Sequence, residues 1–147
     1  MNVGDGAVPA DDLTFRGTVY PWQVDHMGHM NVQHYVAFFD QATWVLFASV
    51  GMTADYWTAE NRGMAAVEQH LRYRREVFAG AVVTVRTRIL EVSTRSVRFR
   101  HVMQEAEEIV ATCELVGVHM DRSRRRAVAF PDTVSDALRG RAMPEEP

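Results

Sequence analysis

The stretch NVQHYVAFFDQATWVLFASVG, residues 31–51, decides the fold of this chain. It opens on Asn31 and closes on Gly51, residue types that begin and end helices, and it has no glycine or proline between them. Its apolar residues recur every 3.6 positions, which predicts one long helix with this stripe turned inward: Val32, Tyr35, Val36, Phe39, Thr43, Leu46 and Val50. Because much of the remaining helix surface is also apolar, we expect burial on more than one side.

The segments on both sides of this helix alternate apolar and polar residues with a period of two, which predicts strands. We expect strands over residues 13–20, 64–73, 82–92, 96–104, 109–121 and 127–130, with turns at 107–108 and 122–126. Short helical pieces are expected over 53–61 and 133–139. Consecutive antiparallel strands with one segregated helix predict an α+β fold, an antiparallel sheet wrapped around one long central helix. Trp, Val and Arg mix on the outer face, so we expect another subunit to cover part of it.

Length and composition predict a single domain. The chain has 147 residues and 16.7 kDa, of which 47% are hydrophobic and 24% charged, and this excludes global disorder. We expect residues 1–12 to be a flexible tail, 13–140 the domain, and 141–147 a frayed C-terminus. The lone Cys113 excludes an intrachain disulfide and a cysteine zinc site, and is expected in the core.

Charge and hydropathy narrow the classes of function. A net charge of −3 and a pI of about 6.0 argue against a nucleic-acid partner. No apolar run reaches the roughly 18 residues that span a membrane, and no secretory leader is recognisable, so we expect a cytoplasmic protein. Arginines concentrate in residues 61–126, with a run at 122–126. This segment either faces an anionic small molecule or decorates solvated strand faces.

A loop dense in polar side chains precedes the long helix: Val24-Asp25-His26-Met27-Gly28-His29-Met30-Asn31. Asp25 is expected beside the helix N-terminus, where unpaired N–H groups and the helix dipole favour a carboxylate or a developing oxyanion. Gly28 removes a side chain where a substrate carbonyl could approach. From the residues alone, Asp25 is also explained as a turn or capping residue.

The same loop, extended to Tyr35, resembles the signature D-x-x-G-H-x-N-x-x-x-Y of the 4-hydroxybenzoyl-CoA thioesterase-like branch of the hotdog-fold acyl-CoA thioesterases. The passage from Leu71 to Gly80 and the last hairpin are similar to that family too, so the resemblance covers residues 13–132. It implies a hotdog fold and hydrolysis of an acyl-CoA thioester to free acid and CoA. It also implies no metal and no cofactor beyond substrate CoA, and a homodimer or homotetramer with sites between protomers.

The resemblance carries roles over to single positions. Asp25 would act as nucleophile or as general base on water, and the backbone N–H of Val32 would polarise the carbonyl, with Gly28 shaping the oxyanion hole. His29 and Asn31 match the signature, and Asn31 is either the N-cap or a polar contact to substrate or Asp25. Candidate substrate-binding residues, each with a structural alternative in the core or in solvent, are Tyr35, Glu68, His70, Arg72, Arg74, Arg75 and Arg124.

Two further candidates lie in or near this loop. Asp40, on the polar stripe of the helix, is interpreted as a solvated or subunit-facing acid or as a functional carboxylate, because some relatives place one on this helix. The pair His26-x-x-His29 has no evident third ligand, so a metal site is not predicted.

The sequence indicates the identity of the acyl group less clearly than it indicates the reaction. Residues 67–80 resemble the subset of the family that cleaves betainyl-CoA, and the Trp and Tyr content suits a quaternary ammonium through cation–π contact. A short or medium aliphatic acyl group is the alternative. Two other functions stay open on the same fold: a non-catalytic acyl-CoA-binding protein and an enoyl-CoA hydratase-type enzyme.

Overall fold

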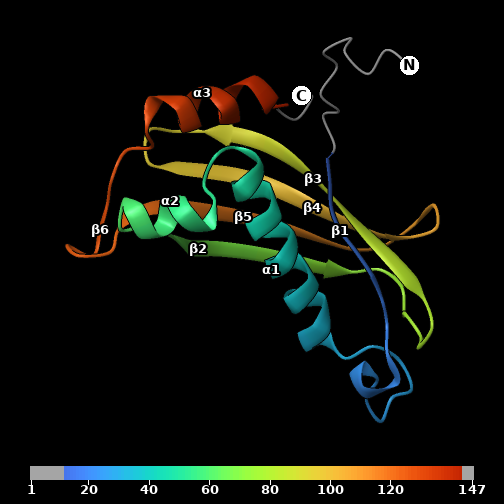
Figure 1. Cartoon of the computed structure of the whole chain (residues 1–147). Helices are drawn as coiled ribbons and strands as arrows, with labels where there is room; N and C mark the ends of the chain where they lie inside the picture. Colours follow the sequence, from blue (N-terminus) through green and yellow to red (C-terminus); the bar gives the residue numbers. More distant parts are fainter. Residues whose placement is uncertain (1–11, 144–147) are drawn as a thin grey trace.

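An antiparallel sheet forms the body of the computed structural model, which describes residues 12–143 (Figure 1). The strand order is β1-β3-β4-β5-β2, with β6 paired to the end of β5, and every pairing between named strands is antiparallel. The strands are β1 (Asp12–Thr18), β2 (Arg62–Tyr73), β3 (Val82–Val92), β4 (Ser96–Glu105), β5 (Glu108–Asp121) and β6 (Arg126–Ala127). The predicted antiparallel α+β arrangement is confirmed.

Within residues 12–143, three α-helices accompany the sheet: α1 (Val32–Ser49), α2 (Ala54–Ala59) and α3 (Asp132–Arg141). A 3-10 turn, η1, spans Pro21–Gln23. The longest, α1, lies across one face of the sheet (Figure 1). It buries one stripe against that face: Tyr35, Phe38, Phe39, Ala42, Thr43, Leu46 and Phe47. The sheet supplies the other half of the core, including Val85, Phe99 and the fully buried Cys113, which confirms the core position predicted for this cysteine.

The buried stripe of α1 differs from the one predicted. Val32 and Val36 were expected inside but are 54% and 37% exposed, whereas Phe38 and Phe47 are buried. Trp44 and Val45 are exposed as well, so in this chain α1 is buried on one side only. The 3.6 period locates the helix but cannot separate the face that meets its own sheet from an apolar face left outside.

The two ends of the chain also differ from expectation. Residues 1–11 of the predicted tail lie outside the described residues, and Asp12 already begins β1. At the other end α3 runs to Arg141, Ala142 bridges to Ile89, and the Met143 amide donates to the Ile89 carbonyl at 2.7 Å. Residues 141–143 are therefore held against β3 rather than frayed. Of the predicted strand 127–130 only Ala127 lies in a strand, because β6 spans Arg126–Ala127.

The contacts between α1 and β2 show how the helix is oriented on the sheet. The Tyr35 ring, near the start of α1, meets the Tyr73 ring at the end of β2 with centroids 5.2 Å apart. The side chains of Phe47, near the end of α1, and Met64, near the start of β2, both lie beside Gly117. The helix therefore runs opposite to β2, and β2 pairs only with β5 in the described chain, so its outer edge is open. No helix within residues 12–143 is long and apolar enough to cross a membrane.

Candidate active site at the start of α1

Asp25 lies in a tight turn ahead of α1. The Gly28 amide donates to the Asp25 carbonyl at 2.9 Å, and the Asp25 amide donates to the His29 carbonyl at 3.1 Å. The Met27 amide donates to Asp25 Oδ1 at 2.8 Å, so the carboxylate is also part of its own turn. Gly28 has a φ of +87° with open space where a Cβ would stand, so the left-handed backbone requires glycine here.

Asn31 connects this turn to the helix. Its Nδ2 donates to Asp25 Oδ2 at 2.7 Å, and its Oδ1 accepts from the Gln33 amide at 3.0 Å as the N-cap of α1. The Asn31 side chain is thus both the cap of α1 and a contact to Asp25. Asp25, Gly28 and Asn31 are brought together as the signature requires.

The pKa of the Asp25 carboxyl is lowered from its ordinary value. The largest cause is the hydrogen bond from Asn31, followed by the Met27 amide, with weaker contributions from the charges of His29 and His26, while burial acts in the opposite direction. The group is therefore ionised near neutral pH. An ionised carboxylate can accept a proton from water or attack a carbonyl directly.

Five of the predicted site residues line one surface pocket of about 310 Å³ beside the start of α1: His29, Val32, Tyr35, Arg74 and Arg75. Val32 is the first residue of α1, so its N–H has no intrahelical acceptor and lies at the positive end of the helix dipole. It directly follows Asn31, which holds Asp25. The pocket and the Asp25 turn are therefore neighbours at the same helix terminus.

The walls of this pocket are fixed by contacts from the end of β2. The Tyr35 hydroxyl donates to the Arg75 carbonyl at 3.2 Å, and burial raises the pKa of Tyr35. The Arg75 guanidinium forms an exposed ion pair with Glu108 at 3.0 Å, and His29 Nε2 lies 3.7 Å from a Glu76 oxygen. Glu76 was not predicted from the sequence, since nothing in its spacing relates it to the loop 47 positions earlier.

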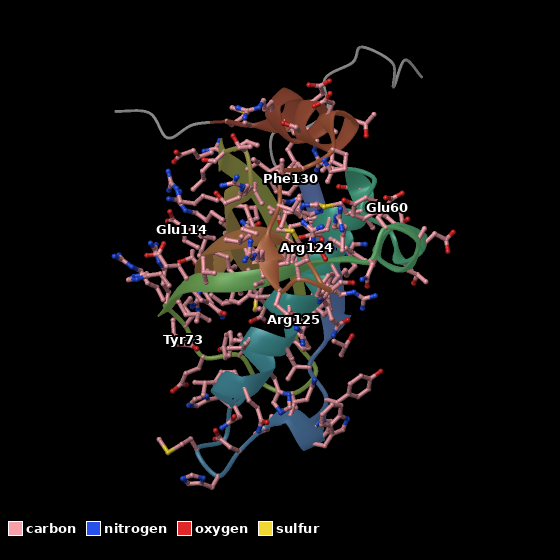
Figure 2. The ribbon with its side chains drawn as sticks, turned by 90° about the vertical axis from the view of Figure 1, so that its left-hand side faces the viewer. Glu60, Tyr73, Glu114, Arg124, Arg125 and Phe130 are labelled. Atoms are coloured by element: carbon pink, nitrogen blue, oxygen red, sulfur yellow. The ribbon has the colours of Figure 1, made fainter. Side chains whose placement is uncertain are left out.

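Three other predicted residues lie together on one face of β2, apart from the pocket beside the start of α1. Glu68, His70 and Arg72 line a surface pocket with Glu114. The alternating β2 residues Gln69 and Leu71 pair with core positions and face α1. Figure 2 shows Glu114 on the side of the molecule opposite Glu60, which follows α2.

Arg124 is also separate from the pocket beside α1. It lies in the turn after β5, where its amide donates to Asp121 Oδ1 at 3.1 Å, and Asp121 pairs with Arg62 at the start of β2. Arg74 follows the other end of β2. A strand of this length spans about 36 Å, so Arg124 and Arg74 of one chain do not meet the same small ligand.

A second cavity, of about 160 Å³, lies between α1 and strands β2 and β5. Its walls include Asp40, Trp44 and Gln69. The sequence places Asp40 and Trp44 on one side of α1, because residues four apart lie on the same helix face. It does not reveal that this face borders a cavity, because that depends on the packing of β2. A group of three or more His, Cys, Asp or Glu residues able to hold a metal is absent from residues 12–143.

Comparison with known proteins defines the class. Residues 19–138 match the model of the thioesterase-like superfamily, and the chain belongs to this family. A protein of Agrobacterium fabrum named L-carnitine dehydrogenase/betainyl-CoA thioesterase is 38% identical over 116 residues. The match covers 78% of this chain but only 24% of that protein. The betainyl-CoA thioesterase of Pseudomonas aeruginosa is 26% identical over 141 residues, covering 90% of this chain and 89% of the relative.

Solved structures show the same fold. A Staphylococcus aureus protein determined in complex with CoA superposes with a TM-score of 0.84 at 21% identity, covering 89% of this chain and 84% of that one. A DHNA-CoA thioesterase from the same organism gives a TM-score of 0.77 at 14% identity, covering 86% and 87%. The predicted hotdog-type architecture is thereby confirmed.

Proposed function

We propose that this chain hydrolyses the thioester of an acyl-CoA, with Asp25 as the reacting carboxylate. The observation that carries the proposal is the hydrogen bond from Asn31, the cap of α1, to Asp25 Oδ2. It places an ionised carboxylate beside the N-terminus of α1, where the amide of the first residue, Val32, has no intrahelical acceptor. Membership of the thioesterase-like superfamily and the names of the relatives support the same reaction.

The geometry supports a simple sequence of bond changes. Asp25 either takes a proton from water, whose oxygen attacks the thioester carbonyl, or attacks the carbonyl itself to form an anhydride that water then opens. In both routes the carbonyl oxygen becomes an oxyanion near the Val32 N–H, where the helix dipole is favourable. The C–S bond then breaks. Thiols have a pKa near 8.5, so the CoA thiolate leaves without a strong general acid.

We assign the pocket beside α1 to the CoA moiety. Arg74 and Arg75 line it and can neutralise phosphate groups, while His29 and Tyr35 form its helix side. The complex of a structural relative with CoA supports CoA as the ligand of this fold. The acyl group is betainyl or another short acyl group, a choice supported by the names of the two curated relatives.

The active unit we propose is a homodimer or a higher homo-oligomer that joins the open β2 edges of two copies. A free edge twelve residues long pairs readily with another strand. In an antiparallel pairing, the Arg62 end of one β2 lies beside the Tyr73 end of the other. Arg124 of one copy then approaches the Arg74 side of its partner, and this arrangement gives Arg124 a role in substrate binding.

Thiol release from acetyl-, hexanoyl-, lauroyl-, benzoyl- and betainyl-CoA tests the reaction. We expect turnover of at least one substrate, and a loss of about 100-fold or more in Asp25→Asn, in the range typical of a catalytic group. Asp55→Asn, at an exposed position on α2, is the matched control.

Binding without thiol release favours an acyl-CoA-binding protein, and water addition to an enoyl-CoA favours a hydratase. A single turnover in H₂¹⁸O tests the nucleophilic route, because label enters the Asp25 carboxylate only when an anhydride has formed and water opens it at the Asp25 carbonyl carbon.

A further inference from the structure

The cavity between α1, β2 and β5 has an unusual combination of lining groups. Its walls are mainly apolar and include the aromatic rings of Phe39, Trp44, Phe47 and Phe99. Among the described residues that line it, Asp40 alone carries a charge. Thr43, one of its few polar neighbours, already donates to the Phe39 carbonyl at 2.9 Å. The cavity thus offers apolar and aromatic surface with a single negative charge.

Asp40 is available to a ligand. Its side chain is exposed, and no arginine or histidine of residues 12–143 lies within ion-pair distance of it. Trp44, one helical turn further on, is 43% exposed. Its ring is braced edge-on by Phe47 and by Trp57, each with centroids 5.8 Å away. A carboxylate without a cationic partner therefore stands beside a held indole ring.

We propose that this cavity binds a quaternary ammonium group on the acyl chain, with Asp40 and Trp44 as the residues that determine specificity. The inference rests on the proposed thioesterase function and names the substrate class of that site. A trimethylammonium has no N–H donors, so it needs no hydrogen-bond acceptors, and its methyl groups suit apolar walls. Its charge is attracted by the Asp40 carboxylate and by the Trp44 face. An anionic acyl group is repelled.

The size of the cavity agrees with this ligand. A cavity of roughly 150 Å³ in a protein interior holds benzene, which has six heavy atoms against four in a trimethylammonium. At about 160 Å³ this cavity accommodates the smaller group. A long aliphatic chain does not fit within it.

Helix geometry indicates that a substrate is shared between two copies: its ammonium group lies in the cavity of one copy, and its thioester lies beside Asp25 of the other. Asp40 follows Val32 by eight residues, so the two are about 12 Å apart along the helix axis. In a betainyl group the nitrogen lies only about 2.5 Å from the carbonyl carbon, the spacing of N and C across an amino-acid Cα. One chain cannot hold the carbonyl at Val32 and the ammonium at Asp40. The opposed direction of two paired β2 edges brings the partner's helix start toward this cavity.

The test compares two acyl groups of the same shape that differ only in charge. Betainyl-CoA carries a trimethylammonium, and 3,3-dimethylbutanoyl-CoA carries a neutral tert-butyl group in its place. We expect wild-type kcat/KM to favour betainyl-CoA, and Asp40→Asn to reduce that preference by about tenfold or more, with the neutral substrate changed less than about twofold. Trp44→Leu is expected to reduce it in the same direction, and Asp55→Asn to leave it unchanged.

Binding separates this inference from the hydrolytic function. Calorimetry with the non-hydrolysable thioether analogues of the same two ligands reports charge preference without turnover. Suppose that Asp40→Asn removes the preference for the ammonium ligand in binding, while neither the wild type nor any variant releases thiol. The cavity assignment then stands and the hydrolytic proposal fails. If the wild type binds both analogues equally, or Asp40→Asn weakens both equally, the ammonium site is overturned.

Co-expression tests the sharing of the site between copies. Asp25→Asn and Asp40→Asn chains produced together form mixed dimers in which one of the two shared sites carries both native residues. Betainyl-CoA hydrolysis above that of either single variant supports a shared site. Activity no higher than the sum of the two variants, in mixed dimers verified by mass spectrometry, contradicts it.

Discussion

Asn31 binds Asp25 and caps α1 at the same time. Its Nδ2 donates to Asp25 Oδ2 at 2.7 Å while its Oδ1 accepts the Gln33 amide at 3.0 Å. One side chain therefore fixes the carboxylate relative to the amides of the helix start. This coupling explains physically why a signature of the form D-x-x-G-H-x-N keeps its spacing, because the turn through Gly28 must return Asn31 to Asp25.

Replacing Asn31 by serine separates the two tasks. Serine remains a good N-cap, so the free energy of unfolding is expected to change by less than about 0.5 kcal/mol, but its shorter side chain does not reach Asp25. Losing the hydrogen bond that contributes most to the lowered pKa of Asp25 raises that pKa. The acid limb of the pH profile of kcat/KM should therefore move to higher pH. Asn31→Ala, which also loses the cap at a cost of about 1 kcal/mol, is the comparison. An unmoved acid limb in Asn31→Ser would contradict the role of Asn31.

A buried histidine should give the fold a pH dependence independent of the active site. His101 is fully buried, with Nδ1 2.6 Å from Thr87 Oγ1 and Nε2 2.8 Å from Thr43 Oγ1, and burial lowers its pKa to about 3. An unfolded histidine has a pKa of about 6.5. Between these values the unfolded chain binds the extra proton, so stability falls as pH decreases from about 6.5 toward 3.

Urea unfolding between pH 7 and pH 4.5 measures this dependence, above the range in which most carboxylates titrate. We expect His101→Gln to be less stable at pH 7 by about 1–3 kcal/mol and to show a shallower loss of stability with acidification. His70→Gln, on the exposed part of β2, is the control and should keep the wild-type slope. The same slope in His101→Gln as in the wild type would show that the histidine is not buried in its neutral form.

The sequence was sufficient for the features that depend on local geometry. Strand 82–92 was predicted with the observed bounds, because a clean period of two is set by neighbouring residues alone. The contact between Asn31 and Asp25 was also among the expectations, since both residues belong to one short loop before a helix.

Features that depend on packing between distant segments could not be predicted in the same way. The face of β2 that carries Glu68 and His70 is set by a bulge between Ala66 and Glu68 and by the register with β5. The hydroxyl groups of the network around His101 come from three separate elements: Thr43 of α1 and Thr87 of β3 bond the imidazole, and Thr14 of β1 bonds Thr87. No periodicity within any one of them reveals that they meet.

Arginine variants should distinguish CoA binding by the pocket of one chain from CoA binding by residues of its partner copy. Arg75 lines the pocket beside α1, so Arg75→Gln is expected to raise KM for acyl-CoA several-fold with little change in kcat, as for lost ground-state binding of a phosphate. Arg124→Gln should raise KM only where β2 edges are paired, and therefore only in the oligomer. Arg86→Gln, at an exposed position on β3, is the control. Steady-state kinetics at two ionic strengths measure the effect, and an unchanged KM in Arg75→Gln would remove this pocket from CoA binding.

A charge on the open β2 edge should separate the copies and at the same time reduce turnover. Val67 lies at the bulge in the middle of β2 and is 59% exposed. An arginine there opposes its own counterpart across a two-fold axis, and inward or edge charges are a common means of preventing strand pairing. Val67→Arg is therefore expected to sediment as a monomer of about 16.7 kDa with thiol release reduced at least tenfold. Val82→Arg, equally exposed at the start of β3 but away from that edge, should keep both the assembly and the activity. A wild-type chain that is monomeric at assay concentration and still fully active would rule out a site that two copies share.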